Sequence, residues 1–178
     1  MSETRLIIDQ LKFSYEGIFD LTGLYRLIDS FFYGRSYDRK EKMNTEMVTP
    51  SGRQIKIELD PWKSITDYFK VTTKIRIHGQ DIKSVDVDKD GAKVTLSEGK
   101  IIIIIDGYGV SYKGGKWGSG PFFWFLRIMF DKFIFKNHYH QAEQWLISDI
   151  DELMSRIKTF LNVYRAHERG LVSSHTLN

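Results

Sequence analysis

Three aspartates and a glycine form the most specific metal-binding pattern in the chain. Asp86, Asp88 and Asp90 stand at alternate positions, and Gly91 follows the last of them. Carboxylate oxygens at this spacing, with a glycine for the sharp turn, match the first half of a calcium-binding loop. The last position of such a loop needs a bidentate glutamate, but Ser97 stands there. An Asp-Gly turn in a β-hairpin explains the same residues, so we expect a hairpin and no metal.

The histidine cluster of the chain consists of His138, His140 and the nearby Glu143. On a helix, His140 and Glu143 are neighbours three residues apart, whereas His138 points elsewhere. Two ligands do not make a zinc site, and the chain has no cysteine to supply a third. We therefore expect the solvated start of a helix and no metal here.

Nucleophilic and phosphate-binding motifs are incomplete in this sequence. Nothing in it resembles a nucleophile elbow. The glycine-rich segment Gly114–Gly120 lacks the Gly-Lys-Ser/Thr ending of a phosphate loop, which indicates a flexible connector. Asp67 interrupts an apolar strand face, where a carboxylate is costly unless it is paired; we expect it near a strand end, reaching water or a basic partner. No catalytic residue, metal or cofactor is assigned.

Composition narrows the class of protein further. The 178 residues carry 26 basic and 23 acidic side chains, a net charge of +3, and the two signs are well mixed along the chain. This balance argues against a dedicated nucleic-acid-binding protein. The basic residues between positions 12 and 42 are diluted by acidic ones, which indicates a solvated face; they are Lys12, Arg35, Arg39, Lys40 and Lys42.

Three observations bear on the compartment. The first five residues lack the apolar core of a signal peptide. No window supplies the roughly 18 apolar residues that a membrane-spanning helix requires. Because cysteine is also absent, we expect a cytoplasmic protein.

The element that must position any site is a strand predicted from Ser64 to His78. Successive side chains of a strand point to opposite faces, so a strand with one dry face shows strict alternation. The residues of the dry face are Ile65, Phe69, Val71, Thr73, Ile75 and Ile77. Polar residues fill most of the alternate positions, from Thr66 to His78. This pattern predicts an antiparallel strand with one wet face.

Similar patterns predict the remaining elements. Asp20 is a suitable N-cap for a helix that ends at Gly34. Turns are predicted at Pro50–Gly52 and at His78–Gln80. The predicted strands are Arg5–Tyr15, Glu41–Thr49, Arg53–Leu59, Ser64–His78, Ile82–Val87, Ala92–Ser97 and Lys100–Ile105, and a long helical stripe follows as far as about Glu168.

The expected fold class is therefore α+β. We predict an antiparallel sheet of about six to seven strands, packed on a long C-terminal helix, with one helix after the first strand. We expect a single domain over residues 1–170 and a flexible C-terminal tail over residues 171–178, because Gly170 interrupts the helical pattern. This order of elements, from Arg5 to Glu168, resembles the helix-grip layout of START-like (SRPBCC) domains. The resemblance implies a curved sheet that wraps the last helix and encloses an apolar cavity.

The strongest anomaly is the aromatic segment Phe122–Phe135. It is apolar on nearly every helical face, and only Arg127, Asp131 and Lys132 break it. Burial between the sheet and a helix is the favoured interpretation. Contact with a protein partner or a second copy comes next, because large apolar patches rarely stay bare. Insertion into a membrane surface comes third, since the polar face is narrow for a helix lying in the membrane plane.

Two functions follow from these features. The first is a non-catalytic domain that shelters an apolar small molecule between the sheet and the C-terminal helix. The expected ligand-binding residues are Phe69, Val71, Ile75, Tyr108, Trp124, Phe125 and Met129. The alternative is an interaction protein that docks a partner, a second copy or a membrane surface through the aromatic segment 117–135. Under either hypothesis we expect binding rather than catalysis.

Overall fold

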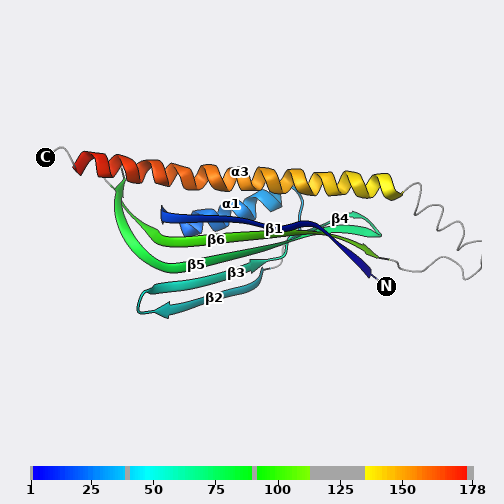
Figure 1. Cartoon of the computed structure of the whole chain (residues 1–178), viewed down its shortest axis with the longest axis horizontal. Coiled ribbons are helices and arrows are strands. Elements are labelled where there is room, and N and C mark those ends of the chain that lie inside the picture. Colours follow the sequence, from blue (N-terminus) through cyan, green and yellow to red (C-terminus); the bar gives the residue numbers. More distant parts are fainter. Residues whose placement is uncertain (1, 39–40, 90–91, 113–134, 176–178) are drawn as a thin grey trace, which may run out of the picture.

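The computed structural model describes residues 2–38, 41–89, 92–112 and 135–175. Within these ranges the chain forms six strands and two helices (Figure 1). In chain order they are β1 (Ser2–Phe19), α1 (Leu21–Gly34), β2 (Glu41–Thr49), β3 (Gly52–Leu59), β4 (Trp62–Thr66), β5 (Phe69–Lys89), β6 (Ala92–Tyr112) and α3 (Phe135–His175).

All six strands belong to one open antiparallel sheet. The strand order is β1-β6-β5-β3-β2, and β4 pairs with the start of β5 beside β3. The sheet and the C-terminal helix confirm the predicted α+β class, and this architecture is compatible with a helix-grip fold. Turns join β2 to β3 and β4 to β5, so the strands of each of these two pairs are neighbours in the sheet, whereas β1 and β2 lie at opposite edges.

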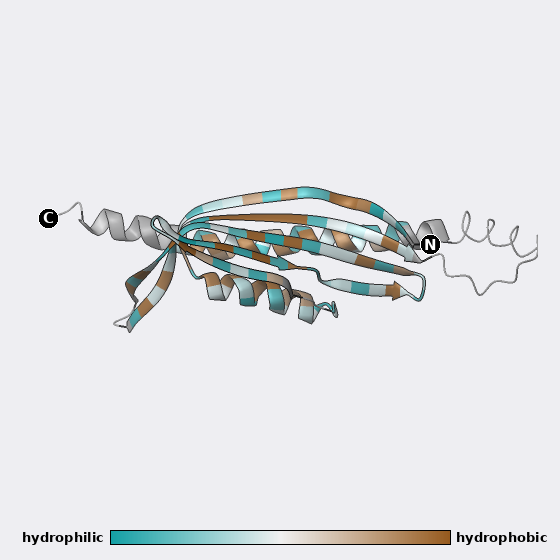
Figure 2. Ribbon diagram, turned by 90° about the horizontal axis from the view of Figure 1, so that it is seen from below, coloured by the Kyte–Doolittle hydropathy of each residue, from teal (hydrophilic) through white to brown (hydrophobic). Residues whose placement is uncertain are grey.

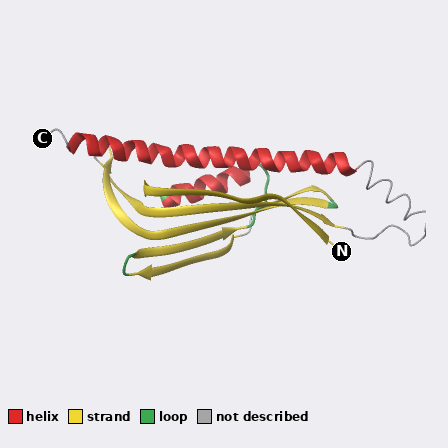
Figure 3. Cartoon of the chain, in the orientation of Figure 1, coloured by secondary structure: helices red, strands yellow, loops and turns green. Residues whose placement is uncertain are grey.

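Both helices lie on the same side of the sheet, with α3 running along it and α1 beside α3 (Figures 1 and 3). A Cβ placed on Gly107 of β6 would lie 3.1 Å from the Leu146 side chain, which shows how closely α3 approaches the sheet. Asp20 caps α1 as predicted, because its side chain accepts a hydrogen bond from the Gly23 backbone.

The core fills the layer between the sheet and the helices. The isoleucines of β6 form a continuous hydrophobic stretch (Figure 2), and Ile101, Ile103 and Ile105 are fully buried. Ile102 and Ile104 point to the other face and are only half-buried. From the helices, Leu24 and Ile150 are fully buried in the same cluster. The alternation of the strands therefore decides which face the helices cover.

The predicted strand from Ser64 to His78 is in fact two strands. A turn at Asp67 and Tyr68 separates β4 from β5, which then pair with each other. The predicted dry face survives on β5, where every second residue from Phe69 to Ile77 is buried. Asp67 is exposed in the turn, as expected for a carboxylate near a strand end.

Other predicted element ends are also wrong. The turn expected at His78–Gln80 is a bulge inside β5, where Asp81 has a φ of 54° and the pairing register shifts. Gly99 has a φ of 155° at the corresponding place in β6, so the two long strands bend together. At the other end of the chain, α3 continues through Gly170 to His175.

None of the helices in the described ranges is long and apolar enough to cross a membrane.

Candidate functional site

A pocket of about 320 Å³ opens between α3 and the β4–β5 edge of the sheet, beside the C-terminal end of α1. Three separate parts of the chain supply its walls. The lining residues are Arg35, Tyr37, Lys63, Ile65, Val71, Ala142, Trp145, Leu146, Ser148 and Asp149. We call this the helix-edge pocket.

The period of each element brings the lining residues to the same space. Lys63 and Ile65 alternate on β4, so both point to the same face, and Val71 of β5 is paired directly opposite Lys63. On α3, Ala142, Leu146 and Asp149 are spaced as one helical face. The pocket therefore lies where one strand face meets one helix face.

One side of the helix-edge pocket is apolar. Val71, Ala142 and Leu146 are buried there, and Ile65 is half-buried. Trp145 stands next to them with 54% of its surface exposed. An indole beside an apolar floor offers an incoming ligand a large surface to cover.

The other side is polar and is organised by Arg35. Its guanidinium forms ion pairs with Asp149 and Glu152 of α3. Tyr37 donates a hydrogen bond from its hydroxyl to the second oxygen of Asp149, at 2.9 Å. Arg156 holds the other oxygen of Glu152 at 2.7 Å. Each carboxylate is thus bonded at both oxygens, and the network ties the end of α1 to the middle of α3.

Burial shapes the acid-base properties of this network. Tyr37 is 5% exposed, so burial first, and then the charge of Asp149, raises the pKa of its phenol. At neutral pH the phenol therefore keeps its proton and donates a hydrogen bond to Asp149. Hydrogen bonding to Arg35 lowers the pKa of Glu152 below its usual value. Glu152 is therefore charged near neutral pH.

The loop after α1 is fixed against β4. At the end of α1, the Arg35 backbone N–H donates to the Phe32 carbonyl and the Ser36 N–H donates to the Tyr33 carbonyl. Asp38 and Trp62 then exchange two backbone hydrogen bonds, of 2.8 and 2.9 Å. Because the loop is held at both ends, Arg35 and Tyr37 meet α3 at a defined place.

Lys63 completes the polar side. Its ammonium donates to the Arg35 carbonyl at 2.9 Å and lies 5.5 Å from the centre of the Tyr37 ring. Within the described ranges, no carboxylate forms an ion pair with it.

The structure separates the predicted ligand-binding residues. Val71 lines the helix-edge pocket, whereas Phe69 and Ile75 are buried in the core. Tyr108 is paired opposite Thr72 and shares the face of the sheet that points away from the helices. The remaining three predicted residues, Trp124, Phe125 and Met129, lie outside the described residues. The cavity wall predicted from the sequence is therefore not one continuous surface among the residues described.

The residues of the calcium-loop pattern and of the histidine cluster form hydrogen bonds and ion pairs with other side chains. Asp86 accepts a hydrogen bond from Thr95 across the hairpin, and Asp90 and Gly91 lie outside the described residues. Glu143 is buried and pairs with Arg5 at 3.0 Å, with His140 at 3.7 Å. In the part of the chain that the structure describes, no group of three or more His, Cys, Asp or Glu residues could hold a metal ion.

Sequence reasoning missed most of the helix-edge pocket. Arg35 was expected on a solvated face, but it is ion-paired to α3. Tyr37, Lys63 and Trp145 had no motif around them. Two signals were present in the sequence, namely the alternation of Lys63 with Ile65 and the helical spacing of Ala142 with Asp149. Most of segment 117–135 falls on residues 113–134, outside the described residues, so docking through it stays a prediction.

Comparison with known protein families found no family model that matches the chain, and comparison with curated proteins found no significant match. A function is therefore inferred from the residues of the helix-edge pocket.

Proposed function

We propose that this protein is a non-catalytic binding domain, and that its helix-edge pocket shelters a small molecule with an apolar body. The observation that carries the proposal is the exposed Trp145 beside a floor of Val71, Ala142 and Leu146. Small-molecule sites are typically concave and mainly apolar, with a few polar groups at defined positions. A volume of about 320 Å³ is at the small end of that class.

Binding is favoured over catalysis by the state of the polar groups. Asp149 and Glu152 both form ion pairs with arginines, and the Tyr37 hydroxyl is hydrogen-bonded to Asp149. A general acid or base must have a pKa near the working pH and a free path to the substrate. The raised pKa of Tyr37 and the lowered pKa of Glu152 move both groups away from neutrality.

We further propose that the chain is a START-like domain. The order of its elements, with one antiparallel sheet against a long last helix, supports this proposal. In such a layout the space between the sheet and the last helix is the expected place for a ligand. The helix-edge pocket lies at one edge of that space.

The test uses two naphthalene probes, naphthaleneacetate and the neutral naphthaleneacetamide, in isothermal titration calorimetry of the full chain. We expect saturable binding of at least one probe, and native mass spectrometry of freshly purified protein can reveal a retained ligand. Ser148→Trp places an indole in the mouth of the pocket and should abolish binding. Ser155→Trp adds the same indole to an exposed position of α3 that does not line the pocket and should leave binding intact. Absence of binding by both probes, or equal binding by both tryptophan variants, would contradict the proposal.

A further inference from the structure

Of the two basic residues that line the helix-edge pocket, Arg35 is paired with carboxylates and Lys63 is not. Arg35 binds Asp149 and Glu152, so each positive or negative group of this network has a partner of opposite sign. Lys63 lines the same pocket but has only a carbonyl oxygen and a ring face as partners. Neither the Arg35 carbonyl nor the Tyr37 ring carries a formal charge that would neutralise the ammonium.

The charged side chains of the pocket and of its ion-pair network also sum to a net positive charge. The positive groups are Arg35, Lys63 and Arg156, and the negative groups are Asp149 and Glu152. Three positive charges against two negative ones leave one positive charge. Each oxygen of the two carboxylates already accepts a hydrogen bond, and none of these bonds comes from Lys63.

The position of Lys63 matters as much as its charge. Lys63 lies directly opposite Val71 in the β4–β5 pair, so its side chain starts at the apolar floor. The hydrogen bond to the Arg35 carbonyl uses one of the three N–H donors of the Lys63 ammonium. Two donors therefore remain for a ligand that rests on the floor.

We propose that the ligand of the helix-edge pocket is an anion, with an apolar or aromatic body on the Trp145 side and a carboxylate or similar acidic group that pairs with Lys63. This inference rests on the proposed binding function and adds the chemical class of the ligand. Apolar surroundings strengthen an ion pair, because water screens the charges less there than at the open surface. Lys63 is thus the residue that sets specificity between acids and their neutral analogues.

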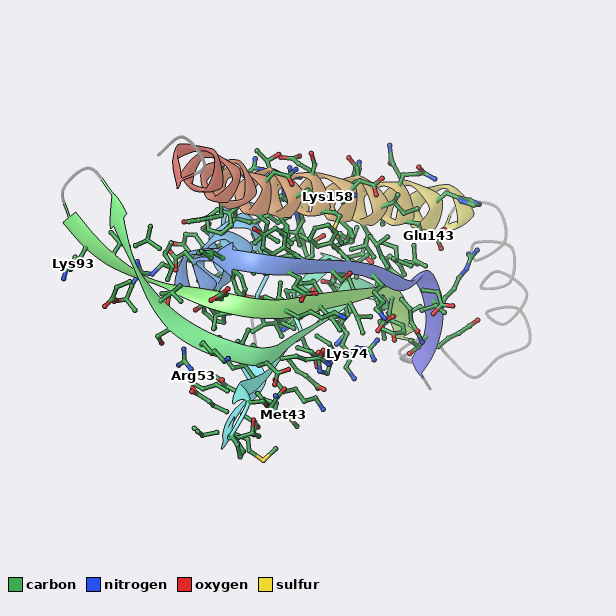
Figure 4. The ribbon with its side chains drawn as sticks, turned by 60° about the vertical axis from the view of Figure 1, so that its left-hand side comes forward. Met43, Arg53, Lys74, Lys93, Glu143 and Lys158 are labelled. Atoms are coloured by element: carbon green, nitrogen blue, oxygen red, sulfur yellow. The ribbon has the colours of Figure 1, made fainter. Side chains whose placement is uncertain are left out.

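The experiment compares naphthaleneacetate with naphthaleneacetamide, which share the aromatic body and differ in charge. A charge-assisted hydrogen bond favours the acid, and we expect it to bind about tenfold more tightly than the amide. Lys63→Met should bring the two affinities close together, whereas Lys63→Arg should keep the preference for the acid. Lys74→Met is the matched control, because Lys74 lies on the side of the sheet away from α3 (Figure 4).

The outcomes separate the two proposals. Equal affinity of the wild-type protein for the acid and the amide overturns the anion inference and leaves the binding function standing. A preference for the acid that is unchanged in Lys63→Met also overturns it, because another group must then supply the charge. Binding of neither probe overturns the binding function and the anion inference together. If Lys63→Met fails to fold, Lys63→Gln removes the same charge with a polar side chain and decides the question in the same way.

Discussion

The hydrogen bond from Tyr37 to Asp149 joins the loop after α1 to α3, and its removal by Tyr37→Phe gives a sharp test of the site geometry. Bonds to charged acceptors contribute about 1.5–3 kcal/mol. Asp149 keeps its bond to Arg35 in the variant, so we expect the lower end, about 1.5 kcal/mol. For 178 residues, an unfolding entropy of about 2.1 cal/mol/K per residue converts this into a fall in Tm of roughly 4 °C.

The assay is urea unfolding at neutral pH together with differential scanning calorimetry. Tyr33→Phe is the matched control, because Tyr33 is 72% exposed and its loss should change the free energy of unfolding by less than about 0.5 kcal/mol. In an Asp149→Ala background the Tyr37 hydroxyl is buried without its acceptor, so Tyr37→Phe should there be neutral or stabilising. The reasoning is refuted if Tyr37→Phe costs no more than Tyr33→Phe, or if its cost is the same with and without Asp149.

Three further predictions follow from the same structure. Burial raises the pKa of Tyr37, so its stabilising effect is complete below the unfolded pKa of about 10 and is lost as the pH rises from there through the folded value. Absorbance titration near pH 10 should therefore lose no phenolate signal in Tyr37→Phe, and the loss of one signal would contradict the burial of Tyr37. Gly107→Ala should destabilise the protein by about 1–3 kcal/mol in urea unfolding, because the new methyl group would lie 3.1 Å from Leu146 and 3.2 Å from Ile8. The control Gly34→Ala should be neutral or slightly stabilising, because nothing lies within 4 Å of its new methyl group. Equal effects of the two substitutions would argue against the close approach of α3 to the sheet. Arg35 lowers the pKa of Glu152, so the stabilising effect of this carboxylate is present above the usual glutamate pKa and is lost as the pH falls. The urea midpoint at low salt should therefore fall less steeply below about pH 4.5 in Glu152→Gln than in the wild-type protein. Identical slopes would show that the Arg35–Glu152 pair contributes nothing to stability.

The sequence predicted the parts of the fold that local chemistry determines. Asp20 caps α1 through its own side chain, and Pro50–Gly52 forms the turn between β2 and β3, because both depend on neighbouring residues. Alternation identified the buried face of β5 for the same reason.

Element ends were predicted less well where the sheet overrides a local signal. The glycine of His78–Gln80 indicated a turn, but pairing of β5 with both β3 and β6 continues around a bulge instead. Conversely, the alternating pattern from Ile65 to Phe69 ran straight through the turn at Asp67. The first error arises because strand pairing depends on residues that are distant in the sequence. The second is a missed turn between two strands that are close in the sequence and pair with each other.

The helix-edge pocket could not be predicted, because its parts are brought together only by the fold. Arg35 and Asp149 are 114 residues apart, and neither belongs to a local motif. Lys63 is distinguished by its place in the wall of this pocket, which no sequence pattern records.

The central claim is that the helix-edge pocket holds an anion through Lys63, and a crystal structure of the protein with naphthaleneacetate tests it most directly. We predict density for the naphthalene ring between Trp145 and Val71, with a carboxylate oxygen about 2.7–3.2 Å from the Lys63 ammonium nitrogen. A probe bound at another surface, or in this pocket with its carboxylate turned away from Lys63, would contradict the claim.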